Sequence, residues 1–146
     1  MPAVYERHGV RFQYPENWNL IEESTRWPRE ITLESPSGAL WALHVYFPPD
    51  SPSRLLQDAL KAMQKEYEGI EYSSVTEQLH ETATADGYDL YFFYLDFVVE
   101  CRLRSFTYRD KTFLLITQAE EREYQQLEPV FRAMTTSLVR HLAGQV

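Results

Sequence analysis

The chain is poor in cysteine, glycine and basic residues, and each shortage excludes a class of protein. Its single cysteine, Cys101, cannot form an internal disulfide and is typical of a reducing compartment. With only 5 glycines and 8 prolines, the 146 residues contain no linker or low-complexity tract, so we expect one domain over residues 1–146. No apolar run reaches the roughly 18 residues of a membrane-spanning helix, and we expect no membrane insertion.

The deficit of basic residues bears on the choice of partner. Lys and Arg number 14 against 22 Asp and Glu, which gives a formal net charge of −8. Proteins bind nucleic acids and anionic membranes largely through Lys and Arg, so we expect neither as a partner. Residues 1–12 carry charge and lack the apolar core of a signal peptide, which predicts a cytoplasmic protein.

The sequence also lacks the motifs of common catalytic sites. It has no Gly-rich phosphate loop, no Ser-centred elbow and no dinucleotide-binding fingerprint. The acidic residues around Glu120 do not match a calcium loop. The histidines show no metal-ligand spacing and are scattered at His8, His44, His80 and His141. We therefore expect no enzyme activity, no cofactor and no metal.

What the sequence does contain is a long apolar stretch, Tyr88–Ala119, that predicts three strands. Its outer strands, Tyr88–Leu95 and Phe113–Thr117, are apolar on both faces, so their sheet needs cover on both sides. The middle strand alternates between an apolar and a charged face, the first with Val99, Cys101 and Leu103 and the second with Glu100, Arg102 and Arg104.

Turn residues separate the remaining predicted strands. Ser35-Pro36-Ser37-Gly38 between two extended runs is typical of a hairpin, and Ala85-Asp86-Gly87 predicts a turn before Tyr88. The strands predicted outside the apolar stretch are Val10–Tyr14, Asn19–Glu22, Arg29–Glu34, Ala39–Phe47 and an edge-like strand at Ile70–Glu81.

Two amphipathic helices are predicted. The first begins after a capping serine, Ser51 or Ser53, and ends near Gly69. The second lies within Glu121–Leu142. We expect its regular part to begin at Leu127 or Glu128, because Pro129 in a helix interior would cost about 3 kcal/mol. Short loops favour antiparallel pairing, so the predicted fold is α+β, an antiparallel sheet of about six to eight strands flanked by two main α-helices.

Two motifs resemble the PsbP-like superfamily, Phe12–Trp18 (FQYPENW) and Phe131–Leu138 (FRAMTTSL). The superfamily includes PsbP of photosystem II, a yeast Ran-binding import factor and bacterial DcrB-like proteins. The resemblance covers about residues 10–142 and implies a sheet flanked by helices and a binding or accessory role instead of an enzymatic one. It carries over no functional residue. Residues 1–12 do not resemble the leader peptide of the photosynthetic and lipoprotein members, so we do not expect a thylakoid or periplasmic role.

Cys101 is the first residue to weigh as a catalytic group, because a thiolate can act as a nucleophile. The predicted hairpin places it on the apolar face with Phe92 and Leu103, where cysteine behaves as an inert core residue. We therefore expect Cys101 in the core.

The charged face of the middle strand allows two interpretations. In the structural one, Asp89 pairs with Arg104 and Tyr91 stacks on an arginine. In the functional one, Arg102 and Arg104, fixed on a rigid strand beside Tyr91 and Glu100, bind an acidic or aromatic group of a partner.

The tryptophans Trp18, Trp27 and Trp41 are interpreted as core or core-rim residues. Trp27, in a loop between Arg26 and Arg29, has the alternative of an exposed anchor for a partner.

The leading functional hypothesis is a non-enzymatic protein-binding or adaptor module whose partner is another protein. The alternative is a small-ligand-binding domain with a pocket between the sheet and a helix. A hydrolase that uses Cys101 comes third. The candidate binding residues are Tyr91, Glu100, Arg102, Arg104 and Trp27.

Overall fold

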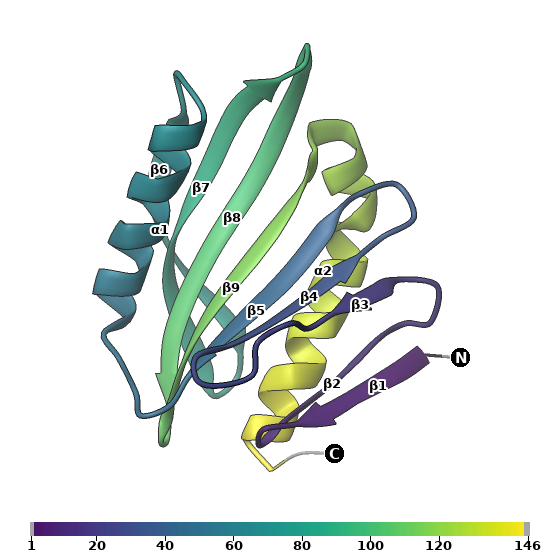
Figure 1. The fold of residues 1–146 in the computed structure, drawn as a ribbon, viewed down its shortest axis with the longest axis vertical. Coiled ribbons are helices and arrows are strands. Elements are labelled where there is room, and N and C mark those ends of the chain that lie inside the picture. The colour runs from purple at the N-terminus through teal and green to yellow at the C-terminus, as the bar shows by residue number, and fades with distance from the viewer. Residues whose placement is uncertain (1, 145–146) are drawn as a thin grey trace.

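A computed structural model describes residues 2–144 of the chain (Figure 1). Over these residues the chain forms nine strands and two helices, in the order β1 (Pro2–Arg7), β2 (Val10–Pro15), β3 (Asn19–Ile21), β4 (Arg29–Glu34), β5 (Leu40–Tyr46), α1 (Pro52–Glu66), β6 (Glu71–His80), β7 (Ala83–Tyr94), β8 (Phe97–Tyr108), β9 (Lys111–Glu120) and α2 (Glu121–Leu142).

Within residues 2–144, seven strands form one antiparallel sheet in the order β3-β4-β5-β9-β8-β7-β6, and β1 and β2 form a separate hairpin. After β5 the chain crosses one face of the sheet as α1 and enters the far edge as β6 (Figure 1). It then returns through β7 and β8 to β9, which pairs with β5. The predicted α+β class with an antiparallel sheet and two flanking helices is confirmed.

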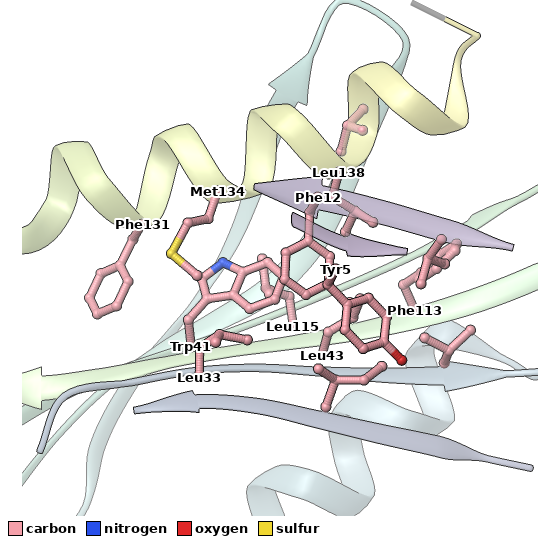
Figure 2. Close-up of a cluster of buried hydrophobic side chains, with 14 of the residues drawn as sticks. Tyr5, Phe12, Leu33, Trp41, Leu43, Phe113, Leu115, Phe131, Met134 and Leu138 are labelled. Atoms are coloured by element: carbon pink, nitrogen blue, oxygen red, sulfur yellow. The ribbon is translucent and has the colours of Figure 1, made fainter. Parts of the chain in front are cut away.

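Each face of the sheet has its own apolar cover, as its two-sided strands require. On one face, Leu56 and Leu60 of α1 pack against Leu90, Phe92 and Cys101. On the other face, α2 and the β1–β2 hairpin close a larger core against β4, β5 and β9. Figure 2 shows this second core, with Trp41 of β5 at its centre. Burying one large apolar side chain contributes about 1.5–3 kcal/mol, so these two layers hold the helices in place.

Several local predictions are confirmed. The hairpin around Ser35–Gly38 forms, and Arg29–Glu34 pairs along its length with β5. Ser51 caps α1, because its Oγ accepts a hydrogen bond from the Arg54 amide at 3.2 Å. The predicted edge-like strand is β6, which is the edge strand of the seven-stranded sheet. Trp41 is buried in the core and Trp27 lies at its rim.

The predicted turn at Ala85-Asp86-Gly87 is wrong, because β7 runs straight through it from Ala83. Gly87 pairs with Val75 of β6 on one side and with Arg104 of β8 on the other. A Cβ on Gly87 would lie 2.0 Å from the Leu103 carbonyl oxygen, so the glycine allows a close strand approach and is not a turn signal.

The predicted start of the second helix at Leu127 or Glu128 is also wrong. The α2 helix begins at Glu121, capped by the Glu120 carboxylate, which accepts from the amides of Arg122 and Glu123. Pro129 sits inside the helix on an exposed position. The carbonyl that loses its partner belongs to exposed Gln125 and can bond to water, which lowers the cost of the proline.

Strand β1 was not predicted, because residues 2–7 show no alternation and bury only Tyr5. The strand forms because β2 offers it a pairing edge and Tyr5 stacks on Phe12 with ring centroids 5.0 Å apart. The Tyr5 hydroxyl also donates to Glu22 at 2.8 Å, which ties the hairpin to the segment after β3.

Candidate functional site

The end of the β7–β8 hairpin extends beyond both neighbouring strands. Strand β6 begins at Glu71, opposite Tyr91, and β9 ends at Glu120, opposite Val99. Residues 92–98 therefore form a two-stranded projection, visible in Figure 1 as the far end of the hairpin, and we call it the hairpin tip.

The hairpin tip exposes large apolar side chains. Phe93 is 73% exposed and Leu95 74%, and Tyr94 and Phe97 are each 54% exposed. Within residues 2–144, eight large hydrophobic residues are exposed, and five of them lie between residues 91 and 97. Scattered apolar residues are normal on a surface, whereas a contiguous group is typical of an interaction site. We call Phe93, Tyr94, Leu95 and Phe97 the tip patch.

The turn of the hairpin is unfavourable for the residues that form it. Leu95 and Asp96 occupy the two turn positions with φ of 50° and 70°. Two-residue turns with positive φ strongly favour Asn-Gly, and a leucine in this conformation costs roughly 1–2 kcal/mol. Leu95 is neither buried nor suited to the turn, so neither packing nor turn geometry accounts for it.

One aromatic residue of the body supports the tip. Tyr67, directly after α1, stacks on Phe92 with ring centroids 4.2 Å apart and meets Tyr94 edge-on at 6.0 Å. Isolated two-stranded hairpins are marginally stable in water, so this contact holds the tip in a defined position.

The predicted charged face lies beneath α2. Arg102 bonds to Glu100 at 2.8 Å and to Glu128 of α2 at 3.0 Å. Arg104 donates a hydrogen bond to Glu77 at 2.7 Å and forms a salt bridge with Asp89 at 2.8 Å, so the predicted Asp89–Arg104 pair is confirmed.

Burial makes these pairs part of the interior. Glu100 is 4% exposed and Arg104 6%, and the guanidinium of Arg102 lies 4.6 Å from the ring centroid of Tyr124. The aromatic partner of Arg102 is thus Tyr124 of α2, whereas the sequence predicted that Tyr91 stacks on an arginine. Each arginine is bonded to two carboxylates of its own chain, so an acidic group of a partner has to compete with them.

A small cavity of about 140 Å³ lies beside these pairs, between the sheet and α2. Its wall includes both arginines, together with Thr117 and Tyr124, whose hydroxyls lie 2.8 Å apart. A larger open groove of about 530 Å³ lies between the end of β2 and α2, lined mainly by apolar side chains that include Tyr14, Pro129 and Met134. None of the predicted binding residues lines this groove.

The structure brings some of the predicted residues together and separates another. Tyr91 is 36% exposed and lies at the base of the hairpin tip, opposite Glu100. Trp27 precedes β4 at the other end of the sheet, where it packs against Phe47 with ring centroids 5.5 Å apart. Trp27 is half-buried, and the structure therefore separates it from the other four candidates.

The tip patch itself was missed by sequence reasoning. Its residues continue the apolar pattern of buried strands, and only the unequal lengths of the neighbouring strands leave them exposed. One signal was present, since the turn contains Leu95 and Asp96 without the usual glycine or asparagine. The two-residue turn of the hairpin is Leu95-Asp96, and the predicted faces of its strands are unchanged.

Cys101 lies in the core as predicted, fully buried between the sheet and α1. Burial raises the pKa of its thiol to about 12, so almost no thiolate is present at neutral pH. We expect native protein to leave Cys101 unmodified by iodoacetamide at pH 8, and protein unfolded in urea to react fully, as measured by mass spectrometry. Complete modification of the folded protein would contradict this assignment.

Two further observations concern the described residues as a whole. In residues 2–144 no group of three or more His, Cys, Asp or Glu side chains is placed to hold a metal ion. Neither helix in this range is long and apolar enough to cross a membrane.

The sequence matches no protein-family profile and no curated protein, whereas solved structures match the fold. PsbP from the cyanobacterium Synechocystis sp. PCC 6803 superposes with a TM-score of 0.62 and 11% identity, over 93% of this chain and 90% of that protein. This chain has a PsbP-like fold. The resemblance seen in Phe12–Trp18 and Phe131–Leu138 is thereby confirmed at the level of the fold.

Two other bacterial structures share this PsbP-like fold. LpqN of Mycobacterium tuberculosis, described as involved in cell envelope biogenesis, superposes with a TM-score of 0.53 and 17% identity, over 92% of this chain and 86% of that one. PA94 of Pseudomonas aeruginosa, a putative regulator of unknown function, has a TM-score of 0.53 and 12% identity, over 94% of this chain and 95% of its own. At such identities the likeness concerns the fold and not the activity.

Proposed function

We propose that this chain is a non-enzymatic accessory module that binds another protein through the hairpin tip. The observation that carries the proposal is the tip patch, four large apolar side chains that are exposed on a projection beyond the neighbouring strands. Tyr94 and Phe97 are cross-strand partners on one face of this projection, and Phe93 lies on the other face. Aromatic residues of this kind dominate the energetics of protein interfaces when they enter a partner's pocket. The PsbP-like fold supports an accessory role.

The charges around the tip favour a protein over a membrane. Asp96 lies in the turn itself and Glu71 begins the strand at the base of the tip. Burial raises the pKa of Tyr91, the carboxylates of Glu100, Asp89 and Glu121 raise it further, and Arg102 lowers it, so three carboxylates and one cation act on this base. Anionic lipid would be repelled there, and so would a second copy of the tip. The partner that fits offers an apolar pocket with a basic rim.

A tip variant should separate binding from folding. Replacing Phe93 and Phe97 by serine removes two exposed rings and should leave the melting temperature nearly unchanged. Partner affinity should fall by about 30-fold or more, because losing central aromatic anchors costs about 2 kcal/mol or more. Tagged wild type and variant are used to isolate partners from the source cells, and the dissociation constant is then measured with the purified partner.

A matched control and a second variant sharpen this test. Val4→Ser changes an apolar residue that is 45% exposed on β1 and should bind like wild type. Leu95→Asn with Asp96→Gly installs the favoured turn, so it should raise the stability by about 1 kcal/mol while it weakens binding. Partner binding that survives both tip variants, or tip-dependent sedimentation with lipid vesicles in place of a protein partner, would overturn the proposal.

The second candidate function, small-ligand binding, is supported by the cavity between the sheet and α2. Its volume of about 140 Å³ is below the roughly 300–1,000 Å³ typical of ligand pockets. Arg102 and Arg104, which line it, are already bonded to carboxylates of the chain. The exposed tip therefore supports protein binding better than this cavity supports a ligand.

A further inference from the structure

We propose that the outer edge of β6 binds an extended, basic segment of a partner protein, which adds a further strand to the sheet. This proposal stands on the geometry of the edge and does not depend on the hairpin tip. Strand β6 pairs with β7 on one side, in regular register from Glu71 to Gln78. Among residues 2–144 no strand pairs with its other side. The outward backbone N–H and C=O groups there form a template for another strand.

The other edges of the fold are closed or short by comparison. Strand β3, at the opposite end of the sheet, has only three residues. Strand β2 of the separate hairpin faces α2, and its Gln13 amide donates to the Ser137 hydroxyl at 2.9 Å. Strand β1 also has an unpaired side, but it has 6 residues against 10 in β6, so β6 is the longest open edge within residues 2–144.

The usual protections of an edge strand are missing from most of β6. Proteins block such edges with Lys, Pro or a bulge. The irregularity in β6 lies at its end, between Gln78 and His80. The segment from Tyr72 to Thr76 is uncharged, contains no proline, and is mostly exposed.

Charge selects the kind of segment that fits. Glu71 and Glu77 lie on the face of β6 that is turned toward α2, the face on which Glu77 bonds to Arg104. Asp86 of β7 is exposed beside Thr76 on the other face. Basic residues on an added strand would therefore lie next to carboxylates, in a chain whose net charge is −8. A second copy would bring the same carboxylates to the seam, which disfavours self-pairing.

A depression beside β6 supplies a place for an apolar side chain. It has a volume of about 280 Å³ and is lined by Ser74 and Thr76 of β6, Asp86 and Tyr88 of β7, and Ser53 and Leu56 of α1, so its floor can take the apolar part of a side chain while Asp86 lies at its wall. Ser74 and Tyr88 are cross-strand partners, so the depression opens on the α1 face. An added strand would direct alternate side chains into it. The expected segment alternates basic and apolar residues, with main-chain bonds for affinity and this pocket for specificity.

The probe for this proposal is a blocked peptide of about eight residues that alternates Lys and Val, a length close to that of the regular edge. It should bind with a dissociation constant below about 1 mM in calorimetry. Hydrogen exchange should slow at amides of β6 and not elsewhere. The Phe93→Ser and Phe97→Ser tip variant should bind the peptide as well as wild type, so that failure of this site and failure of the tip are distinguishable.

Three controls decide the mechanism. N-methylation of alternate peptide amides on the pairing side should weaken binding at least about tenfold, because it removes the main-chain donors. A peptide that alternates Glu and Val should not bind, and Glu71→Lys should weaken the basic peptide. Binding that tolerates N-methylation, protection away from β6, no binding at about 1 mM, or a dimer of the free protein with protected β6 amides would each overturn the proposal.

Discussion

Arg104→Met should lower the free energy of unfolding by about 3 kcal/mol. Methionine keeps much of the side-chain volume but leaves Glu77 and Asp89 without the cation that bonds to both. Water reaches Glu77 and Asp89, whose side chains are 45% and 25% exposed, but not the interior, where the 7% exposed Arg104 side chain also donates to the Tyr88 and Leu103 carbonyls. Urea denaturation followed by circular dichroism measures the change.

This experiment also separates the two interpretations of the charged face. If Arg104 is a recognition residue, its replacement should leave stability unchanged and should weaken partner binding instead. Arg122→Met is the matched control, because that side chain is 82% exposed and should change stability by less than about 0.5 kcal/mol. Adding Asp89→Asn to Arg104→Met should recover part of the loss, since it removes an unpaired carboxylate.

Trp41→Ala should cost more, about 4 kcal/mol, because it empties the centre of the larger core. Trp41 is fully buried, and its ring lies 4.7 Å from that of Phe12 in the β1–β2 hairpin. Its indole N–H donates to Thr135 of α2 at 3.1 Å, so the variant also loses a buried hydrogen bond. One side chain thereby connects the sheet, the hairpin and α2, as Figure 2 shows.

The control for Trp41 is another tryptophan of the same chain. Trp27→Ala removes a half-buried ring at the core rim and should cost clearly less, about 1–2 kcal/mol. Both values come from urea denaturation at one temperature. A Trp41→Ala protein that loses less than Trp27→Ala would show that the hairpin and α2 do not share one core with the sheet.

The two proposed surfaces lie in the same half of the sheet, the half formed by β6, β7 and β8. Strand β6 begins opposite Tyr91, where the hairpin tip starts to project. A partner with both an apolar pocket and a basic extended segment has access to both surfaces at once. The far end of the sheet, where Trp27 lies, belongs to neither surface.

The sequence by itself determined the strands, the helices and the faces of most of this chain. Period-two alternation put Cys101 in the core and Glu100, Arg102 and Arg104 on the opposite face, because neighbouring side chains in a strand point to opposite sides. The cap at Ser51 followed from local chemistry. Such features depend on residues a few positions apart, and a single sequence contains them.

Predictions from neighbouring residues were wrong where a contact distant in the sequence decided the structure. Gly87 belongs to a residue type that is common in turns, yet it lies in a strand because β8 passes close to it. Proline is common in the first turn of a helix, yet Pro129 lies inside α2, at a position that faces solvent. Residues 2–7 form a strand because β2 pairs with them.

The candidate site was decided by tertiary structure alone. Whether Phe93 and Leu95 are buried depends on where β6 and β9 stop, and whether the arginines are available depends on α2 lying above them. Exposure is a property of neighbours that are distant in sequence, whereas alternation is a property of adjacent residues. For that reason the sequence indicated the charged face as the functional candidate, and the assembled sheet indicates the hairpin tip and the β6 edge.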